Sequence, residues 1–191
     1  MKTAGILAAI ALCVPALFAQ DFKLGGKVAD FALQTAAGEP VQYSKLAGDT
    51  TVVMFVSTQC PVSNAYNERM KALYSSYASK GVRFVFINSN ASETGAQVAE
   101  HAKAQGFPFQ VYKDSANLAA DRFDAQVTPE SFVIAKGVIV YHGAVDDNRN
   151  EAQVSSKALR AALDAALAGR PVAQNETKAF GCSIKRAKKT T

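Results

Sequence analysis

The chain of 191 residues has only two histidines and three cysteines. A cysteine hydrolase needs a histidine base within reach of its thiol, whereas His101 falls in an expected helix and His142 near an expected strand end. We expect both imidazoles to face solvent. The thiolate and imidazole groups are also too few for a metal-delivery site. The composition therefore argues against a cysteine hydrolase and a metal carrier, and we expect no metal or other cofactor.

The sequence also lacks an internal repeat, a low-complexity linker and an apolar run of membrane-spanning length. An apolar stretch at residues 4–17 follows Met1-Lys2 and ends near a small-residue cleavage site after Ala19. This pattern is typical of a secretory signal peptide. We expect residues 1–19 to be removed and the protein to be periplasmic or secreted. A lipid anchor on Cys13 is disfavoured, because bulky Leu12 precedes it.

Basic charge is concentrated at the C-terminal end. From Arg170 onward six Lys or Arg residues face a single acidic residue, Glu176, so the body of the chain is nearly neutral. Aromatic residues do not alternate with these charges at stacking distance, which argues against nucleic acid. We expect a polar, mobile and solvated tail over residues 171–191. Contact of this tail with an anionic membrane surface is a less favoured alternative.

The chain does contain one stretch that indicates chemistry. Residues 51–57 are β-branched and aromatic, as in a strand buried on both faces. Cys60 follows after a short connection, and Pro61 stands where the first turn of a helix tolerates proline best. The partial positive charge of a helix N-terminus favours the thiolate of a cysteine placed there. We therefore interpret Cys60 as a nucleophile, the alternative being a buried structural cysteine.

The order of the expected elements predicts one α/β domain over residues 20–170. Parallel strands joined by helices come first and a hairpin adds antiparallel strands. The expected strands are 27–33, a short one beginning at 41, 51–57, 82–88, an extended stretch at 107–112, 131–135 and 138–142; the expected helices are 43–46, 61–80, 92–105, 117–123 and 154–167.

Loss of the signal peptide leaves two cysteines, Cys60 and Cys182, in a compartment where disulfides persist. They can pair in only one way, and the residues alone leave two interpretations open. A structural disulfide closing so long a loop could add about 4–5 kcal/mol to stability. Alternatively, Cys60 is the nucleophile and Cys182 its resolving partner.

The strand–Cys60-Pro61–helix unit and Thr128-Pro129 before the hairpin resemble the thioredoxin-like superfamily, in its redoxin and peroxiredoxin-like (AhpC/TSA-type) branch. The resemblance covers residues 24–168. It implies a three-layer sandwich with a central mixed sheet flanked by helices. It also implies a cis-proline at Pro129 facing the reactive cysteine, so that Pro61, Thr128 and Pro129 border the bound substrate.

Residues 179–185, AFGCSIK, resemble the Gly-Cys-x-Ile-Lys ending of a peroxiredoxin-like group whose active site carries Cys-x-x-Cys-Pro. Here Ser57 replaces the first of those two cysteines. Cys60 must then form its disulfide with Cys182, with a small-molecule thiol or with another protein. Ser57 is expected to remain as a hydrogen-bonding neighbour of the nucleophile.

The resemblance implies a thiol–disulfide oxidoreductase that acts on a thiol or disulfide partner and is restored by an external thiol reductant. A peroxidase acting on peroxides is the first alternative. Its usual signature is incomplete, because Val53 stands where a proline is usual and Arg122 is the only nearby arginine. Thioredoxin-fold copper carriers need a second cysteine where this chain has Asn64. A non-catalytic binding module with a structural Cys60–Cys182 disulfide is the remaining alternative.

Overall fold

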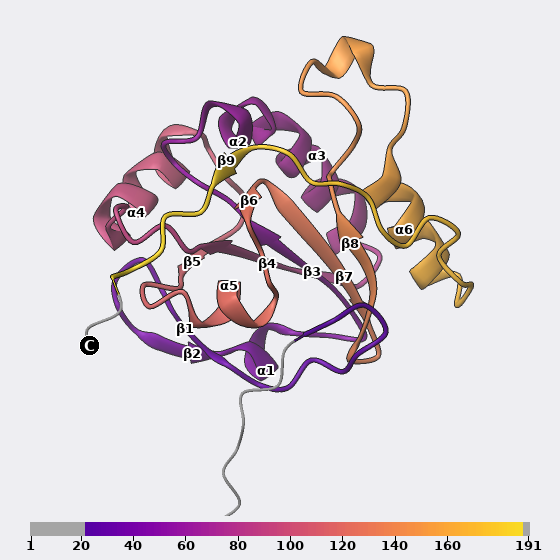
Figure 1. Cartoon of the computed structure of the whole chain (residues 1–191), viewed down its shortest axis with the longest axis horizontal. Coiled ribbons are helices and arrows are strands. Elements are labelled where there is room, and N and C mark those ends of the chain that lie inside the picture. The colour runs from indigo at the N-terminus through magenta and orange to yellow at the C-terminus, as the bar shows by residue number, and fades with distance from the viewer. Residues whose placement is uncertain (1–21, 189–191) are drawn as a thin grey trace, which may run out of the picture.

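A computed structural model describes residues 22–188 (Figure 1). Its centre is a seven-stranded mixed sheet with the order β2-β1-β5-β4-β3-β7-β8, and β6 and β9 form a separate two-stranded sheet. Strands β3, β4 and β5 run parallel, while β7, β8, β1 and β2 pair antiparallel with their neighbours. The strands are β1 Ala32–Gln34, β2 Pro40–Gln42, β3 Thr50–Phe55, β4 Val82–Asn88, β5 Val111–Lys113, β6 Val127–Thr128, β7 Glu130–Ala135, β8 Val138–Gly143 and β9 Cys182–Ser183.

Helices cover both faces of the sheet. They are α1 Tyr43–Leu46, α2 Pro61–Ala65, α3 Asn67–Ala78, α4 Gly95–Ala104, α5 Leu118–Arg122 and α6 Ala158–Leu167, with a 3₁₀ turn at Glu151–Gln153. The alternation of β3 explains the two layers. Val52 and Met54 pack into one apolar cluster with α3 and α6, and Val53 and Phe55 into another with α1 and α5. The expected α/β three-layer sandwich is confirmed.

The long helix expected over residues 61–80 is divided in two at Tyr66, which ends α2 and precedes α3. The Tyr66 hydroxyl donates to Asp146 Oδ1 at 2.8 Å, and Arg69 forms a buried ion pair with the same carboxylate. Asp146 therefore anchors the join between the two helices to the loop after β8. The last helix begins at Ala158 instead of residue 154.

Over residues 171–188 the C-terminal segment lies along the body of the fold, with Phe180 and Cys182 half-buried and Ile184 buried, so the expectation of a fully solvated tail is wrong for this part. It first runs beside β8, where His142 N–H donates to Asn175 O and Thr177 N–H to His142 O. It then crosses between α2 and β6 as β9 (Figure 1). Within residues 22–188 no helix is long and apolar enough to cross a membrane. The expected signal peptide, residues 1–19, lies outside the described residues.

Candidate active site

Cys60 lies at the carboxyl end of β3 and is the N-cap residue of α2, with Pro61 in the first turn of that helix. Its backbone N–H donates to Ser57 Oγ at 3.0 Å, and the Ser63 N–H points at Cys60 Sγ at 3.3 Å. A helix N-terminus and an N–H directed at the sulfur stabilise a thiolate. The residue is only 3% exposed. The sequence-based placement of Cys60 is thus what the structure has.

The Thr128–Pro129 peptide bond is cis, as the resemblance implied. The Thr128 carbonyl oxygen lies 3.3 Å from Cys60 Sγ, so this loop forms the wall opposite the helix N-terminus. The structure therefore brings Cys60, Ser57, Pro61, Thr128 and Pro129 to one place.

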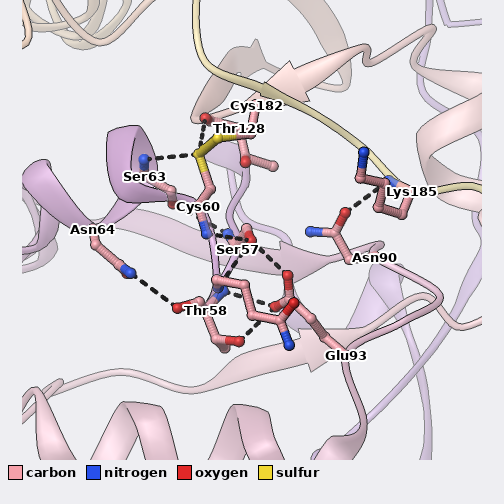
Figure 2. The surroundings of a disulfide bond; sticks show 11 residues. Ser57, Thr58, Cys60, Ser63, Asn64, Asn90, Glu93, Thr128, Cys182 and Lys185 are labelled. Carbon is pink, nitrogen blue, oxygen red and sulfur yellow. Dashed lines mark hydrogen bonds between the residues drawn. A yellow bond between two sulfur atoms is a disulfide. The ribbon is translucent and has the colours of Figure 1, made fainter.

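The sixth predicted residue joins them, since Cys60 and Cys182 form a disulfide across 122 positions of sequence, with 5.8 Å between their Cα atoms (Figure 2). Cys182 reaches this position through β9, which pairs antiparallel with β6 so that Cys182 stands opposite Thr128. Of the two sulfur-bearing residues, Cys60 is buried and Cys182 half-buried. The structure thus contains the one pairing that the two cysteines allow, whose role the residues alone had left open.

Glu93 is the site residue that sequence reasoning missed. It follows β4, is 3% exposed and lies below the turn that carries Cys60 (Figure 2). Its carboxylate accepts hydrogen bonds from Ser57 Oγ at 2.5 Å, from both Thr58 N and Oγ1 at 2.7 Å, and from Asn88 Nδ2 at 2.6 Å. Four donors on one carboxylate fix the turn from residue 57 to 60. Glu93 acts on Cys60 through Ser57, as a positioning residue.

The electrostatics of this carboxylate follow from its partners. Burial alone would raise the pKa of Glu93, but the hydrogen bonds from Ser57, Thr58 and Asn88 outweigh it and hold the pKa below its ordinary value. Asn88 also accepts from the buried ammonium of Lys113 at 2.7 Å. Burial lowers the pKa of Lys113, while the Glu93 carboxylate works in the opposite direction. A bridged pair of opposite charges is therefore buried beneath the cysteine.

The loop that carries Glu93 also holds the tail. Asn90 Oδ1 accepts from Lys185 N–H at 2.7 Å, and Ala91 N–H donates to Lys185 O at 2.8 Å. Residues 89–93 thus contact the Cys60 turn on one side and the strand that carries Cys182 on the other. Both contacts join residues far apart in the sequence, the first beside the parallel pair β3 and β4 and the second beside the pairing of β9 with β6.

Neither histidine faces solvent freely, so that expectation is wrong. His101 Nε2 contacts Asn64 Oδ1 at 2.9 Å, and burial lowers the pKa of His101. His142 stacks on Phe132 and contacts Glu130 Oε1 at 2.6 Å. Both imidazoles are half-buried, His101 between α4 and α2 and His142 between β8 and β7. Among residues 22–188 there is no cluster of three or more His, Cys, Asp or Glu placed to hold a metal ion.

Glu130 braces the loop that ends in the cis-proline. Its carboxylate is buried and its Oε2 accepts from Gln126 N–H at 2.7 Å and from Val127 N–H at 3.0 Å. The other oxygen contacts His142, as described above. Because Glu130 follows Pro129 directly, these bonds fix the position of β6 relative to β7, and with it the carbonyl that faces Cys60.

A central mixed sheet between helices, with a cysteine at a helix N-terminus facing a cis-proline, defines a thioredoxin-like redox protein. The AhpC/TSA family model matches residues 24–142, more than half of the chain, so the chain belongs to the AhpC/TSA family. A peroxidoxin of Mycobacterium tuberculosis shares the fold, with a TM-score of 0.56 and 22% identity over 77% of this chain and 95% of that one.

Closer similarities cover most of the described chain. A hypothetical protein of Sinorhizobium meliloti is 33% identical, with a TM-score of 0.79 over 88% of this chain and 97% of its own. An uncharacterized conserved protein of Geobacillus kaustophilus is 33% identical, with a TM-score of 0.80 over 89% and 95%. Among curated proteins, the thiol-disulfide oxidoreductase ResA of Halalkalibacterium halodurans is 24% identical over 136 residues, 68% of this chain and 76% of ResA. The chain is thus similar to thiol-disulfide oxidoreductases.

Proposed function

We propose that the protein exchanges thiols and disulfides, with Cys60 as the nucleophile and Cys182 as its resolving cysteine. The observation that carries the proposal is the Cys60–Cys182 disulfide itself, formed at the N-terminus of α2 and against the cis-proline loop. A disulfide placed for stability alone needs neither an N–H directed at one sulfur nor a buried carboxylate under the turn. Ser57 takes the place of a second cysteine by fixing the Cys60 N–H.

The steps balance as two exchanges. In the reduced protein the Cys60 thiolate attacks a partner disulfide, forms a mixed disulfide with one partner sulfur and releases the other as a thiolate. The Cys182 thiolate then attacks Cys60 Sγ, which closes the Cys60–Cys182 disulfide and releases the second partner thiolate. The partner gains two electrons and the protein loses two. External thiols then reduce the Cys60–Cys182 disulfide, are themselves oxidised to a disulfide, and so complete the cycle.

The surroundings of Cys60 make it a good leaving group as well as a nucleophile. The Ser63 N–H and the helix N-terminus stabilise the thiolate that departs when the Cys60–Cys182 bond is reduced. Pro61, Thr128 and Pro129 would border the bound partner. As part of the same proposal, residues 1–19 direct the chain out of the cytoplasm, residues 20–170 form the redox domain, and residues 171–191 form the tail that brings the second cysteine.

The test is the catalysed reduction of insulin disulfides by dithiothreitol with the full chain. Wild type is expected to accelerate the reaction and Cys60→Ser to leave the uncatalysed rate. Reduced Cys182→Ser, mixed with insulin after dithiothreitol has been removed, is expected to accumulate a mixed disulfide on Cys60 that non-reducing mass spectrometry detects. No acceleration by wild type, or the same rate with Cys60→Ser, would refute the proposal.

Peroxide reduction is the second candidate, favoured by membership of the AhpC/TSA family. Peroxide would oxidise Cys60 to the sulfenic acid, and Cys182 would condense with it to give the same disulfide and water. A stoichiometric reaction of reduced wild type with hydrogen peroxide separates the two activities. A rate constant no higher than that of free cysteine leaves disulfide exchange as the function.

A further inference from the structure

The edge of β6 beside Cys60 is a strand-pairing site that the tail fills. Within residues 22–188, β6 pairs with β9 alone, with Val127 opposite Ser183 and Thr128 opposite Cys182. The pairing extends one position further, because Ile184 N–H donates to Gln126 O at 2.9 Å. A short edge beside a reactive cysteine can accept an extended segment through main-chain hydrogen bonds, which do not depend on sequence.

The tail also shows which side chains this surface accepts. Its exposure alternates along the strand, with Phe180, Cys182 and Ile184 turned inward and Gly181 and Ser183 exposed. The Phe180 ring packs edge-on against Tyr66, with 6.3 Å between ring centroids. Ile184 is 7% exposed and belongs to the apolar cluster on the other face of the sheet. Two apolar contacts therefore flank the cysteine, one two residues before it and one two residues after.

The residue immediately before the cysteine must be small. A Cβ atom built on Gly181 would collide with the Thr128 carbonyl oxygen, which belongs to the backbone and cannot turn aside. The same oxygen lies 3.3 Å from Cys60 Sγ, so the collision occurs at the reaction centre. The surface thus has three requirements, which are an apolar residue at −2, glycine at −1 and an apolar residue at +2 relative to the cysteine.

We propose that this surface, defined by Tyr66, Val127, Thr128 and the apolar cluster that Ile184 joins, recognises an extended segment of a protein substrate whose reactive cysteine has that pattern. The inference rests on the proposed exchange function and names its substrate class. The tail is the internal occupant, and the substrate segment takes its place once Cys182 is no longer bonded to Cys60. The Cys60 thiolate then attacks the substrate's cysteine sulfur in a disulfide and releases the other sulfur as a thiolate.

Competition between tail and substrate is intrinsic to this arrangement. A tethered segment acts at an effective concentration of about millimolar, and the tail is additionally held by Asn90 and Ala91. Weakening the tail should therefore speed the reaction of Cys60 with an external segment. This increase separates a shared binding surface from a tail that only supplies a thiol.

The experiment uses the full chain carrying Cys182→Ser, with and without Gly181→Val. The probe is the peptide KAFGCSIKR, residues 178–186, with its cysteine bonded to nitrothiobenzoate, whose release is followed by absorbance. The comparison peptide is KASGCSSKR, with serine at both apolar positions. Ser183→Val in the Cys182→Ser chain is the matched control, because Ser183 is exposed on the same strand.

We expect KAFGCSIKR to react at least about tenfold faster than KASGCSSKR in the Gly181→Val chain. Burial of each of the two apolar side chains should raise the rate by a factor that approaches about ten. We expect both the native-tail chain and the Ser183→Val control to react more slowly with KAFGCSIKR. Equal rates for the two peptides, or no effect of Gly181→Val, overturn the inference. Failure of Cys60 to react even with the small disulfide dithiobis(nitrobenzoate) in the folded chains overturns the exchange function itself.

Discussion

The two sulfurs of one disulfide are held in very different ways. Cys60 is buried between the end of a fully buried strand and a helix N-terminus, above a carboxylate with four hydrogen-bond donors. Cys182 is half-buried on the two-residue strand β9, and the buried side chain of this segment is Ile184, just after the strand. Local stability is lowest where few apolar contacts hold a segment. Under the proposed function, the firmly held position belongs to the nucleophile and the less firmly held one to the resolving cysteine.

Substitution of each cysteine gives the largest expected contrast. Cys60→Ser removes all exchange above the uncatalysed rate, because the remaining thiol, Cys182, lacks the helix N-terminus and the directed N–H that stabilise the Cys60 thiolate. Cys182→Ser leaves the first attack intact and blocks only resolution, so a single turnover proceeds and the mixed disulfide persists. Single-turnover kinetics with a chromogenic disulfide measures both variants. Equal loss of the first attack in both would contradict the division of roles.

The next largest effect is expected at Glu93. Glu93→Ala leaves Ser57, Thr58 and Asn88 with buried unpaired donors, so the free energy of unfolding should fall by about 2–4 kcal/mol. Urea unfolding monitored by circular dichroism gives the value. Glu68→Ala is the matched control, because its exposed pair with Lys71 is worth less than about 1 kcal/mol. A loss at Glu93 as small as that of the control would show that the carboxylate does not hold the turn.

On the Cys182 side, Gly181→Ala should weaken the disulfide without unfolding the body. The added Cβ collides with the Thr128 carbonyl, and a cost of about 1.4 kcal/mol in the oxidised form corresponds to a reduction potential about 30 mV higher. Equilibration in dithiothreitol buffers with alkylation and mass spectrometry measures the shift. Ser183→Ala serves as the control, and a potential unchanged in Gly181→Ala would mean that the tail does not press against this carbonyl.

The smallest expected effect is the pH dependence of the stability that Glu93 contributes beneath Cys60. The pKa of Glu93 is lower in the folded than in the unfolded protein. Its contribution to stability is therefore fully present above the unfolded pKa of about 4.3 and is lost as the pH falls through the folded pKa. The stability difference between wild type and Glu93→Gln should therefore shrink below about pH 4. Unfolding curves of both proteins at pH 7, 5, 4 and 3 test this prediction. A stability difference that grows on acidification would contradict the lowered pKa of Glu93.

Local signals in the sequence predicted one half of the site well. Strand composition, the cysteine and the proline after it act over about ten residues, and they place Cys60 and Pro61 correctly. The cis bond at Thr128-Pro129 was implied by the resemblance and the Cys60–Cys182 pairing by the cysteine count, and the structure contains both.

Glu93 could not be found in this way, since its four donors come from β4 and from a turn more than thirty residues earlier. A polar residue just after β4 was the available signal, because neighbouring parallel strands end at the same edge of a sheet. The tail was misjudged for a similar reason. Its basic residues suggested a solvated end, and the alternation of the inward side chains Phe180, Cys182 and Ile184 indicates a strand only once the edge of β6 is known to be its partner.

The reduction potential of the Cys60–Cys182 pair tests the central claim most directly. The full chain is equilibrated in thiol–disulfide buffers of graded potential, and the reduced fraction is counted by alkylation and mass spectrometry. An exchange protein should show a single two-electron transition between about −120 and −270 mV, the range of catalytic dithiols. This transition should be absent in Cys182→Ser. A disulfide that resists reduction until below about −300 mV is typical of structural bonds and would contradict the account.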